Sequence, residues 1–316
     1  MADKPERILS NGMTRLQNVQ RLQYYKQGPA ERELDFCDYV WDIPYGTDSD
    51  RQCVDIYTPK GKKGPFPTII YVHGGGWFAG DRKDRGANNA LFYVEHGFAV
   101  AAIGYRLADE AVYPAQRDDL ANGLAKVTEV AEQYGLDMSR LGIVGGSAGT
   151  PLIMTLALRD PRFKAVCMTS SILDFGRITK QLQALNLPRV AQYGYPEQDW
   201  SMEALLIGGA VQAFPSRTAD LCARRHIHKD MPHCLLFHGT KDNVTPFLQA
   251  VEFAEAATEV TEDPTRVTLV LAPGRGHTIK PDFMHQYYDY RVNFMKKHLC
   301  APQEETVQVQ EEADYL

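Results

Sequence analysis

The 316-residue chain lacks the features that mark several classes of protein. It has no run of about eighteen apolar residues, the length that crosses a membrane, and its first residues, MADKPERILS, lack the apolar stretch of a signal peptide. Its six cysteines are scattered without a CxxC pair or a metal-type spacing, so we expect buried free thiols and no disulfide framework. Together these absences predict a cytoplasmic protein without membrane insertion.

An excess of positive charge is also missing. The formal net charge is -6 and the pI is near 5.9. Binding to nucleic acid or to an anionic membrane usually needs a basic face, so we expect neither partner. The one basic cluster, KGKKG at 60–64, lies between two strand-like runs and is interpreted as a solvated turn.

Strand-like and helix-like segments alternate along most of the chain. Helical spacing of apolar residues occurs at 116–134, 148–159, 246–258 and 283–299. Runs of β-branched and aromatic residues predict eight strands, at 36–43, 52–58, 67–73, 98–105, 140–146, 164–170, 233–239 and 267–273. The alternation predicts an α/β fold with an eight-stranded, mostly parallel sheet and helices on both faces.

Three regions fall outside this alternation and set the expected domain organisation. Residues 1–35 carry a helical pattern and are expected to form an N-terminal cap segment, whereas 300–316 form an acidic, frayed tail. The main domain is expected at 36–299. Within it, residues 172–228 have no clear strand but several aromatics, which predicts a lid-like insertion that walls a pocket. A plain packing subdomain is the alternative.

Ser147 stands between a strand-like run and a helix-like run, in the sequence GIVGGSAGT. Its G-x-S-x-G pattern is typical of a sharp strand-to-helix turn that lifts a nucleophilic serine above a sheet. The motif alone is weak, but the strand before it and the helix after it are the context that such a turn requires. We therefore predict that Ser147 is a nucleophile.

A nucleophilic serine needs a base, and the base needs an acid to orient it. In this architecture the chain order is Ser, then Asp or Glu, then His. Asp242 follows the strand at 233–239 and His277 follows the strand at 267–273, so both leave the same edge of a parallel sheet as Ser147. The order predicts a triad of these three residues. Asp174, which also follows a strand, is the main rival acid.

Other histidines have simpler interpretations. His285 and His298 lie in the last helical segment, where His298 is expected to support the helix dipole. His226 and His228 form an H-x-H pair, but no third ligand stands at a metal-type spacing. We expect no metal and no cofactor.

Three consecutive glycines follow a strand in the stretch IIYVHGGGWFAG, residues 69–80. Glycine loses more backbone freedom on folding than any other residue, so the run indicates a backbone that approaches something closely. Attack by a serine on a carbonyl creates negative charge that preorganised N–H groups must stabilise. We predict an oxyanion hole made by the N–H groups of Gly75, Gly76 and Ala148, with His73 and Trp77 holding the loop. A simple glycine-rich turn is the alternative.

Five segments resemble, in the same order, the α/β-hydrolase esterases of the hormone-sensitive-lipase-like group: HGGGW, YRLADEAVYPAQRDDL, DMSRLGIVGGSAGT, HGTKDNVTP and GRGHT. This group includes bacterial carboxylesterases, kynurenine-formamidase-like enzymes and the related acetyl-xylan or feruloyl esterases. The likeness covers residues 36–299 and implies the α/β-hydrolase fold with the triad and oxyanion hole named above. Gly146 replaces an Asp of many lipase-like members, Gly76 an aromatic of many formamidase-like members, and Thr150 a frequent Gly.

The resemblance implies a serine carboxylic-ester hydrolase that acts on short-chain acyl or acetyl esters through an acyl-enzyme. We expect Trp77, Tyr193, Tyr195 and Trp200 to line the pocket for a small-molecule ester. Alternatives are an arylformamidase or amidase with the same triad, a serine peptidase, which usually adds a large separate domain, and a non-catalytic ligand-binding protein on the same scaffold. A homo-oligomer is compatible with the sequence.

Overall fold

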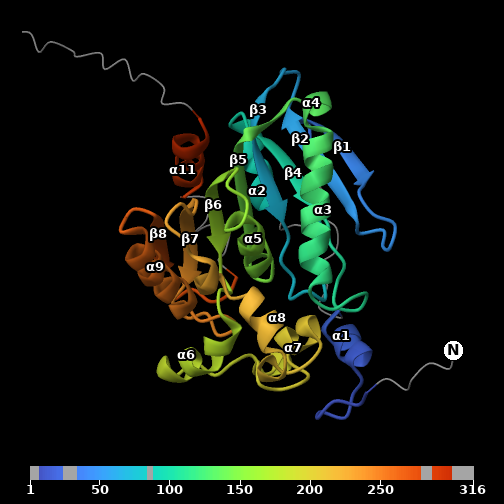
Figure 1. The fold of residues 1–316 in the computed structure, drawn as a ribbon, viewed down its shortest axis with the longest axis vertical. Helices are drawn as coiled ribbons and strands as arrows, with labels where there is room; N and C mark the ends of the chain where they lie inside the picture. Colours follow the sequence, from blue (N-terminus) through green and yellow to red (C-terminus); the bar gives the residue numbers. More distant parts are fainter. Residues whose placement is uncertain (1–6, 24–33, 84–87, 279–286, 301–316) are drawn as a thin grey trace, which may run out of the picture.

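The computed structural model describes residues 7–23, 34–83, 88–278 and 287–300. They contain an eight-stranded sheet with the order β1-β2-β4-β3-β5-β6-β7-β8 (Figure 1). The first two pairings are antiparallel and the others are parallel. The strands are β1 (Cys37–Pro44), β2 (Cys53–Pro59), β3 (Phe66–Val72), β4 (Ala99–Ile103), β5 (Leu136–Gly146), β6 (Phe163–Thr169), β7 (His233–Gly239) and β8 (Val267–Ala272). The predicted fold class is confirmed.

Helices connect most of these strands. They are α1 (Arg15–Gln23), α2 (Asn88–Glu95), α3 (Ala115–Glu129), α4 (Ala131–Tyr134), α5 (Gly149–Ala157), α6 (Ile178–Ala184), α7 (Met202–Ile207), α8 (Pro215–Asp220), α9 (Leu248–Thr261) and α11 (Tyr288–Leu299). The prediction of a single helix at 116–134 is wrong in one respect, because the helix is interrupted at Val130, which ends α3 and precedes α4. Gly135, with a φ of 66°, then ends α4 in the left-handed conformation that favours glycine.

The core has two halves, one on each face of the sheet. Ile70 and Val72 of β3 belong to the half that includes α3, α5 and α9, whereas Ile69 and Tyr71 belong to the half that includes α2 and α11. Successive side chains of a strand point to opposite faces, so a strand covered on both sides is apolar throughout. This burial fixes the strand ends from which the loops of the site emerge.

The insertion at 172–228, all of it described, contains helices and no strand. Figure 1 shows its helices α6, α7 and α8 gathered at one end of the sheet, with α1 beside them. Arg15 of α1 donates to the carbonyl oxygen of Leu205 at 2.9 Å, and Arg21 donates to that of Gln192 at 3.1 Å. The N-terminal helix α1 and the insertion at 172–228 therefore form one layer, which we call the cap layer. Residues 1–6, 24–33 and 301–316 of the expected cap segment and tail lie outside the described residues.

The cysteines are free, as expected, and four of them are buried: Cys37, Cys167, Cys222 and Cys234. Among the described helices, none has the length and apolar character needed to cross a membrane.

The expectation that a charged His298 supports the dipole of α11 is wrong. Burial, together with the neighbouring His233, lowers the pKa of His298 to about 4. The two imidazole rings stack with centroids 4.1 Å apart, and Phe294 packs edge-on against His298 at 4.8 Å. At neutral pH the ring therefore carries no charge and acts as a packing group. His285 lies outside the described residues.

This stack should make the protein lose stability in mild acid. The pKa of His298 is about 4 in the folded protein against 6.5 for an ordinary histidine, so the unfolded chain takes up the proton first as the pH falls. The free energy of unfolding should therefore decrease from about pH 6.5 towards pH 4. His298→Phe keeps an aromatic ring in the stack and should show a smaller decrease in urea unfolding. The exposed His96→Gln should retain the full decrease, and equal decreases in wild type and His298→Phe would contradict the prediction.

Candidate active site

Ser147 stands at the turn between β5 and α5. Its φ of 50° is left-handed for a residue with a side chain, which is the strained geometry expected at a nucleophile turn. A Cβ on Gly149 would lie 2.8 Å from the carbonyl oxygens of both Val72 and His73, so only glycine lets α5 begin this close to β3. These constraints project the Ser147 side chain from the end of the sheet.

The structure brings Ser147, His277 and Asp242 together. Oγ of Ser147 lies 2.8 Å from Nε2 of His277, and Nδ1 of His277 lies 2.8 Å from Oδ2 of Asp242. The side chain of Asp242 is 0% exposed and that of His277 is 23% exposed. The buried acid can thus orient a base that reaches both the serine and the solvent side of the site.

The carboxylate of Asp242 is held in its charged form. Burial raises its pKa, but the neighbouring His277 and hydrogen bonds from His238 and His277 outweigh this effect and hold the pKa well below its ordinary value. The backbone N–H groups of Val244 and Thr245 each donate to Oδ1 at 2.9 Å, and the hydroxyl of Thr245 donates to Oδ2 at 3.0 Å. A charged carboxylate is the form that can hold the Nδ1–H of the base.

The rival groups lie elsewhere. Asp174 accepts a hydrogen bond from the N–H of Gly176 at 3.0 Å and so caps the short 3₁₀ helix at Phe175–Arg177. Nε2 of His226 lies 3.0 Å from the carbonyl oxygen of Asp220, and Nε2 of His228 lies 3.1 Å from that of Leu158. The described residues contain no cluster of three side chains that could hold a metal ion.

The glycine loop after β3 faces the turn at Ser147. The indole N–H of Trp77 donates to the carbonyl oxygen of Ala148 at 2.8 Å, which joins the loop to the first residue after the nucleophile. Within the described part of the chain, the N–H groups of Gly75, Gly76 and Ala148 donate to no other group. These N–H groups are therefore free to donate to a bound group, and their role as an oxyanion hole stays a prediction.

Trp77 is placed differently from the pocket wall that we expected. Its side chain has no exposed surface and packs edge-on against Phe175 with ring centroids 5.5 Å apart. His73 stacks on Tyr105 at 4.2 Å. A fully buried indole cannot contact a substrate, so Trp77 fixes the loop from behind.

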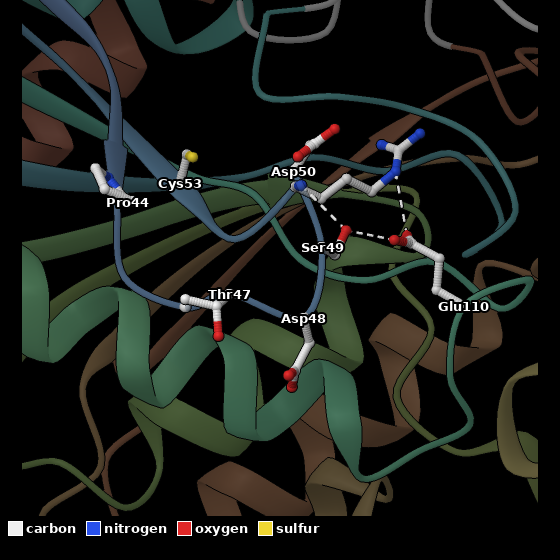
Figure 2. A pocket seen from close by; sticks show the side chains of 9 residues that line it. Pro44, Thr47, Asp48, Ser49, Asp50, Cys53 and Glu110 are labelled. Atoms are coloured by element: carbon white, nitrogen blue, oxygen red, sulfur yellow. Dashed lines mark hydrogen bonds and ion pairs between the residues drawn. The ribbon is translucent and has the colours of Figure 1, made fainter.

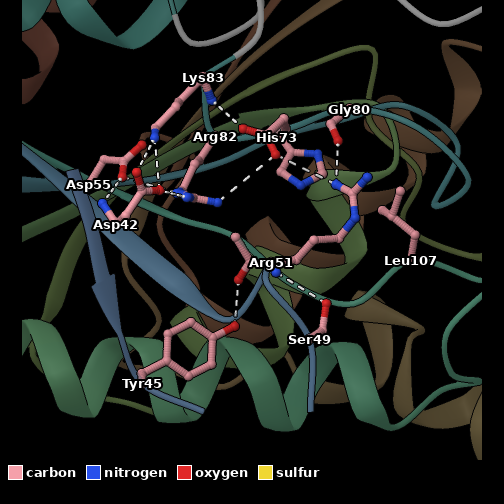
Figure 3. A network of polar contacts seen from close by, with 12 residues as sticks. Asp42, Tyr45, Ser49, Arg51, Asp55, His73, Gly80, Arg82, Lys83 and Leu107 are labelled. Carbon is pink, nitrogen blue, oxygen red and sulfur yellow. Dashed lines mark hydrogen bonds and ion pairs between the residues drawn. The ribbon is translucent and has the colours of Figure 1, made fainter. Parts of the chain in front are cut away.

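Charged residues that the motifs did not reveal anchor the far end of this loop (Figure 3). Nε of Arg82 donates to Oδ1 of the buried Asp55 at 3.0 Å, and the Arg82 guanidinium also pairs with Asp42. Arg51 donates to the carbonyl oxygen of Gly80 at 2.9 Å. The only signal in the sequence is the charged stretch DRK directly after the loop, which has no spacing rule that would name its partners.

Of the three aromatics expected from the insertion, Tyr193 reaches the glycine loop. Its ring centroid lies 6.3 Å from that of Phe78, whose ring packs against Gly76. The ring of Trp200 instead packs against Gly194 and lies 5.8 Å from the Arg21 guanidinium carbon of α1. The hydroxyl of Tyr195 accepts from the N–H of Arg189 at 3.5 Å. These contacts place Tyr195 and Trp200 within the cap layer.

Thr150, the departure from the frequent glycine, joins the nucleophile turn to the insertion. Its hydroxyl donates to the carbonyl oxygen of Ser147 at 2.6 Å and accepts the N–H of Ile172 at 2.8 Å. Ile172 is the first residue of the insertion.

A separate hollow of about 610 Å³ lies beside the β1–β2 loop (Figure 2). In its lining the hydroxyl of Ser49 donates to the carboxylate of Glu110, and Arg51 pairs with the same carboxylate at 3.3 Å. None of the three triad residues lines this hollow, so we do not assign it to the site.

Gly75→Ala should impair the loop severely. Gly75 has a φ of 110°, and a Cβ there would lie 2.2 Å from the carbonyl oxygen of Ala79, so the backbone must move. We expect kcat for an ester to fall by about 10²- to 10³-fold, as for the loss of one oxyanion donor, with a smaller change in KM. Gly61→Ala is the matched control, because Gly61 has a φ of 64° but open space around its Cβ position. Equal kcat values in the two variants would contradict this role.

The sequence of this chain is similar to a known protein family and to individual esterases. The BD-FAE family model matches residues 54–257, more than half of the chain. The probable carboxylic ester hydrolase LipM of Mycobacterium tuberculosis is 26% identical over 75% of this chain and 56% of its own length. The probable isoprenylcysteine alpha-carbonyl methylesterase ICME of Oryza sativa subsp. japonica is 24% identical over 75% of this chain and 57% of its own length. The chain thus spans little more than half the length of these relatives.

Solved structures share the fold. A truncated carbohydrate esterase from gut microbiota superposes with a TM-score of 0.71 at 24% identity, covering 87% of this chain and 100% of that one. Thermogutta terrifontis esterase 2, phosphonylated by sarin, superposes with a TM-score of 0.65 at 20% identity over 86% of this chain and 99% of its own.

Proposed function

The chain belongs to the BD-FAE family, and we propose on this premise that it is a serine carboxylic-ester hydrolase. The observation that carries the proposal is the continuous pair of 2.8 Å contacts from Ser147 through His277 to Asp242. The esterase names of LipM and ICME support the same class of reaction.

The geometry supports a two-step acyl transfer. His277 Nε2 takes the proton of Ser147 as Oγ attacks the ester carbonyl, and the charged Asp242 stabilises the imidazolium that forms. The N–H groups of Gly75, Gly76 and Ala148 then stabilise the oxyanion. His277 returns the proton to the leaving alcohol, and a water activated by the same histidine hydrolyses the acyl-enzyme. Each step uses groups of this chain.

The substrate pocket is proposed to lie between the glycine loop after β3 and the cap layer. Tyr193 meets Phe78 there, and Phe78 packs against Gly76, so two aromatic rings stand next to the proposed oxyanion site. Large rings at this position would restrict the acyl site to a short acyl or acetyl group. This arrangement supports short-chain esters as substrates.

Initial rates on p-nitrophenyl acetate, butyrate and decanoate test the proposal, with Ser147→Ala protein as the blank. We expect turnover of acetate and butyrate well above that of decanoate. Hydrolysis of N-formylkynurenine without comparable ester turnover would instead indicate an amidase with the same triad. No turnover of any of these substrates above the blank would overturn the proposal and favour a ligand-binding protein.

A further inference from the structure

A second histidine, His238, lies against the triad acid. It is the penultimate residue of β7, and its side chain is 0% exposed. Its Nε2 lies 2.8 Å from the carbonyl oxygen of Thr245 and 3.3 Å from Oδ2 of Asp242. Both neighbours are acceptors, since the carboxylate of Asp242 is charged, so Nε2 of His238 must carry a hydrogen.

The other ring nitrogen, Nδ1, shows that His238 does not relay protons. Nδ1 of His238 is buried and has no hydrogen-bond partner among the described residues. A histidine that relays protons needs an acceptor or a donor at both nitrogens. The ring can therefore serve only as a fixed donor through Nε2.

The Nε2–H of His238 contacts both ends of the turn that carries Asp242. Asp242 begins the turn and Thr245 ends it, and the N–H and hydroxyl of Thr245 both donate back to Asp242. β7 pairs on both sides, with β6 and β8, so the ring projects from a fixed strand. A donor on a rigid strand that touches both ends of the turn restricts the rotation of the carboxylate.

We propose that His238 is a positioning residue that holds Oδ2 of Asp242 in line with Nδ1 of His277 through its Nε2–H. The inference rests on the proposed hydrolase function, because the effect is expressed through the triad. His238 does not touch the substrate.

A matched pair of substitutions tests the donor. His238→Gln places an N–H at the reach of Nε2, whereas His238→Met has similar length and flexibility but no donor. We expect His238→Met to lower kcat on p-nitrophenyl acetate by about 10- to 100-fold with KM nearly unchanged, as expected from displacement of a catalytic group. His238→Gln should recover most of the lost kcat. Rates are expressed per site titrated with diethyl p-nitrophenyl phosphate, so that misfolded protein does not count.

His228→Met is the control for loss of a histidine that donates to a backbone carbonyl but does not contact the triad, and it should leave kcat unchanged. Equal kcat in His238→Met and wild type would overturn the proposal. Equal losses in the Met and Gln variants would also overturn it, because the volume of the ring and not its donor would then be responsible.

If neither variant folds, a measurement on the wild-type protein tests which ring nitrogen of His238 carries the hydrogen. Nuclear magnetic resonance of histidine-labelled wild type should show His238 with its hydrogen on Nε2, and a hydrogen on Nδ1 alone would overturn the proposal. This measurement needs no ester. Absence of ester turnover in wild type would therefore refute the proposed function, while the position of the hydrogen would still test the role of His238.

Discussion

Ser147→Ala should abolish ester hydrolysis. The substitution removes the Oγ that lies 2.8 Å from the base, and no other hydroxyl of the described residues forms this contact with Nε2 of His277. We expect kcat to fall by at least about 10³-fold and towards ~10⁶-fold, because the residual rate would come from the oxyanion hole and substrate binding alone. Initial rates on p-nitrophenyl butyrate measure the loss.

The exposed Ser216→Ala serves as the matched control and should keep the wild-type rate. Labelling with diethyl p-nitrophenyl phosphate should add one phosphoryl group to wild type and none to Ser147→Ala. A labelled or fully active Ser147→Ala protein would mean that another residue is the nucleophile.

Asp242→Asn should lower kcat by about 10⁴-fold while the protein remains folded. The asparagine amide can present its N–H₂ group to Nδ1 of His277, which stabilises the tautomer with the hydrogen on Nε2. That tautomer cannot accept the proton of Ser147. The loss should be measured as kcat on p-nitrophenyl acetate, with the unfolding midpoint as a check on folding.

Asp174→Asn separates the two acids that the sequence offers. Asp174 caps a short turn, and asparagine caps about as well as aspartate, so this variant should keep nearly all activity. A large loss in Asp174→Asn together with a small loss in Asp242→Asn would contradict the assignment of the acid.

The sheet could be predicted because its strands are buried on both faces. A strand such as β3, with every residue buried, reads as an unbroken apolar run that is hard to mistake for a loop. The sequence did not predict α2, because Asn88–Glu95 is short and lies between a glycine-rich loop and the next strand. The arrangement of the insertion was also out of reach, since its short helices pack by long-range contacts such as that between Arg15 and Leu205.

The triad residues could be named because each follows a strand of a parallel sheet, but the sequence left Asp174 as a rival acid, and only the contact of Asp242 with His277 separates the two. The groups that support the triad could not be named. His238 and Thr245 contact Asp242 through a turn whose geometry no spacing rule describes. Trp77 was expected both to hold the loop and to line the pocket, because an aromatic beside a glycine loop suits either role, and only its packing against Phe175 distinguishes them.

The distance along the chain between the members of the triad has a consequence for how the protein matures. Ser147 and His277 are 130 positions apart and meet only because β5, β6, β7 and β8 are paired side by side. Such long-range parallel pairing is slow to form, because closing each loop costs conformational entropy before the new strand contacts stabilise the chain. During synthesis or refolding, helical signal should therefore appear before any ester turnover. Under the proposed hydrolase function, ester turnover would report completion of the sheet and would serve as a readout of when the last strand has joined.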